Sequence, residues 1–151
     1  MNLYKKIRAF LSFKWSMKCL LAEAFFFLAA GRIFKLIPFL RSSSILGNHM
    51  EETTFTVNSV EIEVLKNISD AIHIMSRYTF WESQCLVKAV AGMKMLERRE
   101  IESTLYLGTA KNDQGDLIAH AWLRSGPFYV TGAEEMGNFI VVGKFAKQIK
   151  A

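Results

Sequence analysis

Cysteine is scarce in this sequence of 151 residues, which contains only Cys19 and Cys85, far apart in the chain. Two distant cysteines argue against a disulfide framework and favour a reducing, cytoplasmic compartment. Histidine and cysteine form no closely spaced group, so the sequence predicts no metal site. Repeats and low-complexity tracts are also absent. A hydrophobic share of 51% excludes a disordered chain and, at this length, indicates one globular domain.

The sequence also lacks an apolar run long enough to cross a membrane. The longest candidate, residues 19–31, falls short of the ~20 apolar residues that a bilayer requires and is interrupted by Glu23. We predict instead a helix over residues 14–34 that ends near residues 37–38, because proline disfavours a helical residue before it. A helix docked on a soluble protein is favoured over a helix on a membrane surface and over a targeting segment.

Acidic residues are nearly missing from the first third of the chain. Residues 1–50 contain eight Lys or Arg and one acid, Glu23, whereas the remainder contains eleven bases and thirteen acids. Nucleic acid is not supported as a partner, because no aromatic-and-basic groove, zinc spacing or helix-turn-helix pattern accompanies the charge. A membrane surface, an acidic leader or an acidic partner protein would suit it, and the alternative is that these charges form the solvated face of docked helices.

The rest of the pattern predicts an α+β fold. Residues 41–48, RSSSILGN, favour a linker between an N-terminal helical region, 1–50, and a compact core, 51–151. Helical periodicity begins at a cap, Asn58, and returns in residues 81–99. Four strand-like runs follow: STLYLGTA, LIAHAWLR, FYVTG and FIVVGKFA. We expect them to form an antiparallel meander, with the helix of residues 81–99 packed on it as the central helix.

Cys85 lies at the entrance of this central helix. Two caps compete there: Thr79 with Glu82 forms a capping box, whereas Ser83 would place Cys85 at the second helical position. His120 lies in mid-strand on the same face as Trp122. Cysteine proteases and transglutaminases use such an arrangement, because the base takes the thiol proton and the helix amides hold the thiolate and the oxyanion. The alternative is an ordinary packing role for the cysteine and the histidine.

The remaining cysteine and histidines are weaker candidates. Cys19 lies inside a hydrophobic run and is expected in the core. His49 in the linker and His73 on a helix are expected to be plain surface or core residues.

The segments CLVKAVAGMKMLERREIESTLYLGTAK, LIAHAWLRSG and YVTG together resemble the leader peptidase of lasso-peptide biosynthesis, the protease half of a split B protein in the transglutaminase-like, papain-like superfamily. The likeness is close over residues 81–146 and looser over residues 27–47. It implies a cysteine peptidase that removes the leader from a ribosomally made precursor through a thioester, with water as the final acceptor. By the resemblance, Cys85 is the nucleophile and His120 the general base.

The same resemblance implies partners for this peptidase. They are the precursor peptide, a separate leader-binding protein that delivers it, and the ATP-dependent macrolactam cyclase that acts next. No metal or organic cofactor is implied. A catalytically silent peptide-binding module and a transglutaminase-like enzyme that joins amide to amine are the alternatives on the same fold.

The third catalytic residue is where the sequence departs from the family pattern. Many relatives carry an Asp on the strand after His-Ala-Trp that orients the imidazole, but residues 130–135 read VTGAEE. If SGP closes a tight hairpin, Glu134 and Thr131 are within cross-strand reach of His120, and Glu134 is our first choice. Asn138 and a Cys–His dyad are the alternatives.

Two more residues are candidates for binding substrate. Trp122 is a candidate for lining the substrate groove, with packing as its alternative. Gln84 is a candidate for the oxyanion hole, with solvated surface as its alternative.

Overall fold

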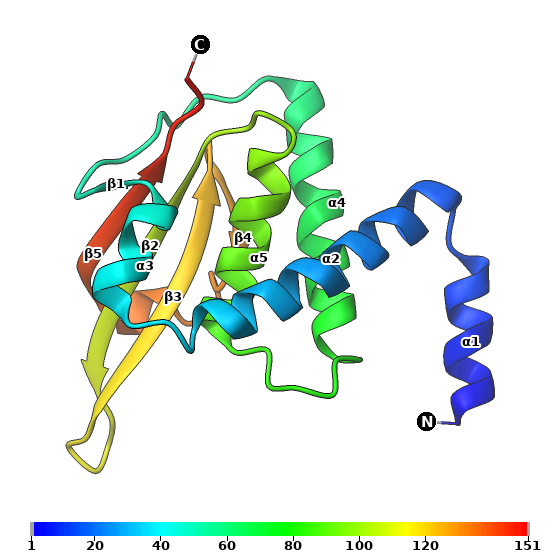
Figure 1. Cartoon of the computed structure of the whole chain (residues 1–151), viewed down its shortest axis with the longest axis horizontal. Coiled ribbons are helices and arrows are strands. Elements are labelled where there is room, and N and C mark those ends of the chain that lie inside the picture. Colours follow the sequence, from blue (N-terminus) through cyan, green and yellow to red (C-terminus); the bar gives the residue numbers. More distant parts are fainter. Residues whose placement is uncertain (1, 151) are drawn as a thin grey trace.

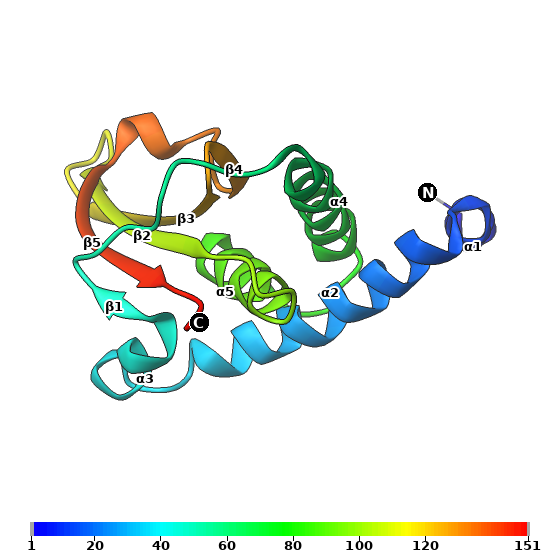
Figure 2. The ribbon, with the colours of Figure 1, turned by 90° about the horizontal axis from the view of Figure 1, so that it is seen from above.

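An antiparallel sheet of five strands, in the order β1-β5-β2-β3-β4, forms one side of the protein in the computed structural model, which describes residues 2–150 (Figure 1). Helices α2, α4 and α5 pack together beside the sheet, and α1 projects beyond them (Figures 1 and 2). The predicted α+β fold with a central helix on an antiparallel sheet is confirmed. The elements in chain order are α1 Leu3–Ser12, α2 Trp15–Phe34, α3 Phe39–Leu46, β1 Asn48–His49, α4 Ser59–Ser76, α5 Cys85–Glu97, β2 Ser103–Lys111, β3 Leu117–Ser125, β4 Phe128–Thr131, the 3₁₀ helix η1 Met136–Asn138, and β5 Ile140–Lys147.

Strands β2 to β5 coincide closely with the four predicted strand-like runs, but their order in the sheet is not a simple meander. β2, β3 and β4 follow one another as antiparallel neighbours, whereas β5 pairs with β2 instead of β4. The chain between β4 and β5, which includes η1, crosses the end of the sheet to reach the free edge of β2. A segment of this length spans two strands, whereas a tight hairpin would have forced β5 beside β4.

The serine-rich stretch expected as a linker is regular structure. Residues 39–46 form α3, and Leu46 at its end is fully buried. β1 then pairs with β5, with Asn48 opposite Ala146. Gly47 joins the two with a φ of 113°, a conformation open to glycine. Burial of the apolar positions therefore overrides the turn preference of the serines, and part of the region 1–50 is built into the sheet.

Helix α2 has the predicted bounds and is apolar on its inner face. Its fully or nearly buried positions pack against α4 and α5, and they are Leu21, Ala24, Leu28, Gly31 and Phe34. Glu23, the acid that interrupts the apolar run, accepts two hydrogen bonds from the Arg99 guanidinium at 2.7 and 2.8 Å. Cys19 is exposed, because it lies on the outer face of the helix; its expected place in the core is wrong.

On the sheet face turned away from α5, a buried arginine holds the segment 51–57 in place. Arg124 is fully buried in mid-sheet and donates to backbone carbonyls of Thr53, at 3.0 Å, and Gly126, at 2.7 Å. Its Nε donates to the Tyr106 hydroxyl at 2.9 Å. Figure 2 shows this segment crossing the sheet on its way from β1 to α4. The guanidinium replaces the strand hydrogen bonds that this irregular segment lacks.

The carboxylate of Glu52 extends this network and makes stability depend on pH. The hydrogen bond from Tyr106 holds the pKa of Glu52 below its ordinary value of 4.5, with a further contribution from Lys144 at 3.1 Å. Burial and the Glu52 carboxylate raise the pKa of Tyr106 to about 12.

We expect Glu52 to stabilise the fold above pH 4.5 and to lose that contribution as the pH falls through its lowered pKa, because the unfolded chain then binds the proton more readily. The expectation is tested by measuring the urea midpoint of unfolding for wild type and Glu52→Gln at a series of pH values from neutral to below 4.5. The two curves should converge at the acid end. Parallel curves would contradict it.

Candidate active site

Helix α5 begins at Cys85 itself. Gln84 is the N-cap residue, with extended backbone angles, so Cys85 is the first helical residue; both predicted caps are wrong. The Thr79 hydroxyl lies 2.9 Å from the Ser83 hydroxyl, and Thr79 also donates to the Trp81 carbonyl. These two side chains therefore stabilise the preceding turn instead of capping the helix.

The first turn of α5 leaves its amides available to a ligand. The first amide of α5 that has a backbone partner is that of Lys88, whose N–H donates to the Gln84 carbonyl at 3.0 Å. No side chain among the described residues caps the helix. The amides of residues 85–87 therefore point past the helix end, where they favour negative charge. A thiolate or an oxyanion beside Cys85 would meet these donors.

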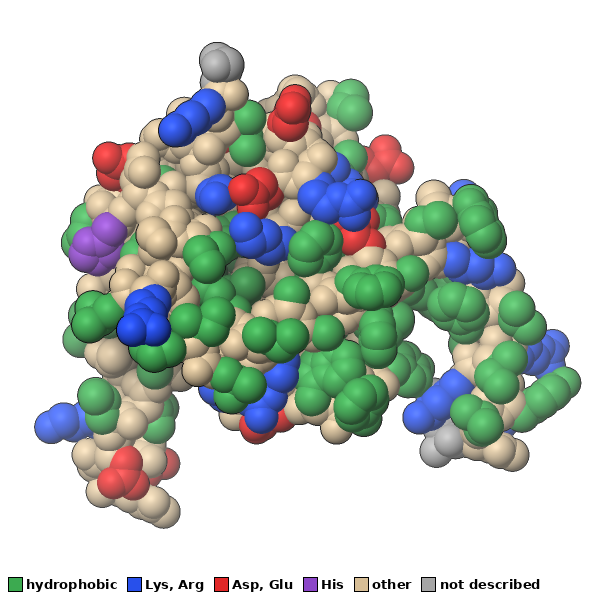
Figure 3. All heavy atoms as spheres, in the orientation of Figure 1, with side chains coloured by type: hydrophobic (Ala, Val, Ile, Leu, Met, Phe, Trp, Pro, Cys, Tyr) green, Lys and Arg blue, Asp and Glu red, His purple; other side chains and the backbone are tan. Residues whose placement is uncertain are grey.

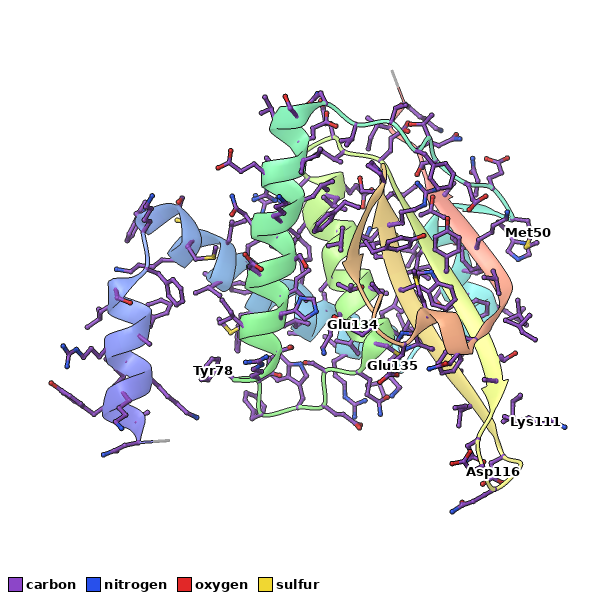
Figure 4. The ribbon with its side chains drawn as sticks, turned by 180° about the vertical axis from the view of Figure 1, so that it is seen from behind. Met50, Tyr78, Lys111, Asp116, Glu134 and Glu135 are labelled. Atoms are coloured by element: carbon purple, nitrogen blue, oxygen red, sulfur yellow. The ribbon has the colours of Figure 1, made fainter. Side chains whose placement is uncertain are left out.

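Cys85 and His120 line one pocket of about 550 Å³, although 35 positions of sequence separate them. Cys85 is partly exposed at the start of α5, and His120 is 8% exposed on β3. The complete lining is His73, Gln84, Cys85, Lys88, Ala119, His120, Thr131, Gly132, Glu134 and Glu135. Glu134 and Glu135 lie at the lower end of α5 and β4 in Figure 4. The α5 start, the outer part of β3 and the end of β4 thus meet at one place.

The orientation of the His120 ring is set by the backbone. Its Nε2 lies 2.8 Å from the carbonyl oxygen of Gly132. Because a carbonyl oxygen only accepts, Nε2 is a nitrogen that carries a proton, and the other ring nitrogen, Nδ1, is the one that can accept a proton. The rings of Trp122 and Phe139, with centroids 5.8 and 5.0 Å away, pack against the imidazole.

Gly132 occupies a position that other residues would strain. Its φ is 75°, and a Cβ placed there would lie 2.5 Å from the carbonyl oxygen of Ala121. The chain turns out of β4 at this point and passes close over β3, which brings the Gly132 carbonyl to His120. A glycine is therefore needed for the carbonyl to orient the ring.

Residues 33–143, well over half of the chain, match the family described as the transglutaminase-like superfamily. The chain belongs to this superfamily. Searches of curated proteins and of solved structures each gave no match. The matched range includes all of α4 and α5, so both Cys85 and His120 of this transglutaminase-like domain lie within it, whereas α1 and most of α2 precede it.

The residues predicted to orient His120 lie in the pocket without bonding to it. Thr131 pairs with Leu123 at the end of β4, and its buried hydroxyl has no hydrogen-bond partner among residues 2–150. Glu134 is exposed at the pocket wall, beyond the strand. The strand ends before it reaches a position opposite His120, and the observed hydrogen bond goes to Gly132. The third catalytic residue of this transglutaminase-like protein stays a prediction.

Trp122 and Gln84 differ in their relation to the pocket. Trp122 is 4% exposed, stacks on Tyr106 at 5.5 Å and does not line the pocket, which favours the packing role. Gln84 does line the pocket, but its side-chain amide donates a hydrogen bond to Glu82 at 2.6 Å and accepts one from Lys35. Its part in an oxyanion hole stays a prediction.

The pocket lining also includes His73, a weaker candidate in the sequence, and Lys88, which was not a candidate. His73 projects from α4, where its Nδ1 donates to the Ser69 carbonyl at 2.7 Å, so its Nε2 is the free nitrogen. Lys88 lies three residues, about one helical turn, after Cys85. This spacing is the one sequence signal that could have pointed to Lys88. Among residues 2–150, no three His, Cys, Asp or Glu side chains are grouped so that they could hold a metal ion.

Proposed function

We propose that this protein is a cysteine peptidase that removes the leader from a ribosomally made lasso-peptide precursor. One observation carries the proposal: Cys85 at the free amides of α5 shares a pocket with His120, whose Nε2 donates to the Gly132 carbonyl. Membership of the transglutaminase-like superfamily supports cysteine chemistry on an acyl group. The resemblance of residues 81–146 to the leader peptidases supports the kind of substrate.

The proposed reaction begins with transfer of the Cys85 thiol proton to Nδ1 of His120. The thiolate attacks the scissile carbonyl carbon, and the negative charge that develops on the carbonyl oxygen is held by the first amides of α5. The C–N bond then breaks, and the imidazolium gives its proton to the leaving amine. This step leaves the leader as a thioester on Cys85 and frees the amino terminus of the core peptide.

Water completes the cycle. His120 takes a proton from water as the hydroxyl attacks the thioester, the C–S bond breaks, and the proton returns to the sulfur. Through both half-reactions the Nε2–H···O=C bond to Gly132 keeps Nδ1 as the reacting nitrogen and stabilises the imidazolium. We further propose that a separate leader-binding protein delivers the precursor and that the macrolactam cyclase receives the freed amine.

The proposal is tested by mass spectrometry of the precursor peptide incubated with this protein and the leader-binding protein. We expect cleavage at one bond, with fragment masses that sum to the precursor plus one water, and no cleavage with Cys85→Ala. Cys19→Ala is the matched control, because Cys19 is exposed on α2, away from the pocket, and this variant should cleave as wild type does.

Three results would contradict the proposal. A product that has lost ammonia and gained an amine would indicate amide joining, and an intact peptide that binds tightly would indicate a silent module. Cleavage that survives Cys85→Ala would exclude this nucleophile. Glu134→Gln in parallel tests the orienting residue: a wild-type rate would leave the Gly132 carbonyl in that role.

A further inference from the structure

The three N-terminal helices form a layer along one side of the protein, as Figure 2 shows, with α4, α5 and the sheet behind it. Much of this layer precedes the part of the chain that matches the superfamily. Figure 3 looks directly onto it and shows hydrophobic side chains gathered over α1, α2 and α3 with lysines and arginines between them. We call this surface the N-terminal face. We propose that the N-terminal face binds the surface of an anionic lipid bilayer.

Helix α2 presents a complete apolar stripe to solvent. The residues of this stripe follow each other at spacings of four or three and are all exposed: Trp15, Cys19, Ala22, Phe26, Ala30 and Ile33. Phe26 is 73% exposed and Trp15 78%. Since the opposite stripe of α2 is buried in the core, the helix is apolar on both sides, a pattern that normally belongs to a helix covered on both sides.

The exposed apolar surface continues on both ends of α2. Helix α1 is amphipathic and buries none of its residues, so Tyr4, Ile7 and Leu11 remain accessible. At the other end, Leu36 just before α3 and Leu40 on α3 are exposed, Leu40 to 92%. Isolated exposed leucines are ordinary, but exposed apolar side chains gathered on three successive helices mark a binding surface.

The basic side chains of this region have no acidic partner. The eight bases of residues 1–50 form no ion pair among residues 2–150, and they are Lys5, Lys6, Arg8, Lys14, Lys18, Arg32, Lys35 and Arg41. Glu23, the one acid, is neutralised by Arg98 and Arg99. Aromatic and aliphatic residues together with lysines and arginines that lack acidic partners are the composition of helices that lie in the interface of anionic membranes.

Other occupants fit the N-terminal face less well. A second copy would bring two strongly cationic surfaces together, which like charge disfavours. A peptide in the apolar groove of about 450 Å³ between α1 and the end of α4 would cover Ile7 and Phe10 but leave the α2 stripe bare. No helix of residues 2–150 is long and apolar enough to cross a membrane, so the contact is with the surface.

Binding by this face leaves the candidate active site accessible. Glu134 and Glu135, which line the pocket of Cys85 and His120, are in view in Figure 4, from the side opposite to the N-terminal face. A protein held on a bilayer by α1, α2 and α3 would therefore present its pocket to the aqueous side. The inference does not depend on the proposed peptidase function.

The experiment is co-sedimentation of the full-length protein with vesicles of phosphatidylglycerol and phosphatidylcholine in equal parts, compared with phosphatidylcholine alone. We expect binding to the anionic vesicles that weakens as salt is raised. Phe26→Glu should lower the partition coefficient by roughly tenfold or more, because it replaces a membrane-embedded ring with a charge. Lys18→Gln should lower it about fivefold, the contribution of one basic residue near an anionic surface.

Leu117→Glu is the matched control, because Leu117 has the same 73% exposure as Phe26 but lies on β3. It should bind as wild type does, and circular dichroism should show all variants folded. Wild type that stays in the supernatant with anionic vesicles at low salt would overturn the proposal, as would equal losses for Phe26→Glu and Leu117→Glu. A wild-type dimer that Phe26→Glu breaks would overturn the proposal in favour of a second copy as the occupant. Binding of an acidic helical peptide without any vesicle binding would overturn it in favour of a peptide.

Discussion

Replacing His120 with alanine is expected to slow peptide cleavage by about 10²–10⁴-fold, the usual contribution of a general base. The reason is geometric: His120 shares the pocket with Cys85, and its bond to Gly132 leaves Nδ1 as the accepting nitrogen. Single-turnover cleavage of the precursor, followed by mass spectrometry with saturating leader-binding protein, measures the effect.

His73→Ala is the matched control for this prediction. His73 lines the same pocket and also has one nitrogen committed to a backbone carbonyl, that of Ser69. We expect its loss to change the rate only a few-fold, since a pocket histidine that is not the base contributes through binding. A larger loss for His73→Ala than for His120→Ala would assign the base to α4. Alkylation of Cys85 by iodoacetamide gives a second readout that needs no substrate and should slow with His120→Ala.

Arg124→Met is expected to lower the free energy of unfolding by about 3 kcal/mol or more, although Arg124 does not line the pocket. The side chain is fully buried and donates to the carbonyls of Thr53, Thr54 and Gly126. Methionine fills much of the space but leaves these acceptors unpaired, at about 1–3 kcal/mol for each one that water does not reach. Urea denaturation measures the change.

Arg98→Met is the control for the stability experiment. The Arg98 side chain is 63% exposed and forms a 3.3 Å ion pair with Glu23, so we expect its replacement to cost below about 1 kcal/mol. Similar small losses for both variants would mean that the segment 51–57 is held by packing alone.

Local signals predicted those parts of the fold that local chemistry decides. The alternation of apolar residues located β2 to β5, and the Asn58 cap was correct, since its side chain accepts from the Glu61 amide at 2.8 Å. The residues of α3 and β1 were missed because serine and glycine favour turns, while their burial against β5 depends on a strand a hundred residues away. The same dependence on distant contacts explains the strand order and the outward position of Cys19.

For the site, sequence reasoning selected Cys85 and His120, which the structure places in one pocket and whose catalytic roles stay predictions, but it did not find what surrounds them. Cys85 and His120 carry recognisable chemistry, and each sits in a clear periodic pattern. The Gly132 carbonyl has no side chain that a pattern could reveal, and His73 reaches the pocket only because α4 packs beside α5 and β4. Backbone groups and packing neighbours of this kind become apparent only once the tertiary structure is known.

Using a main-chain carbonyl to orient His120 has a consequence for how this site tolerates genetic change. A carboxylate in that role is removed by a single substitution, whereas every residue carries a carbonyl. The orienting oxygen can be displaced only by altering the path of the backbone, through Gly132 itself or an insertion or deletion between β4 and η1. Side chains at residues 133–135 can consequently be substituted without loss of the orienting hydrogen bond.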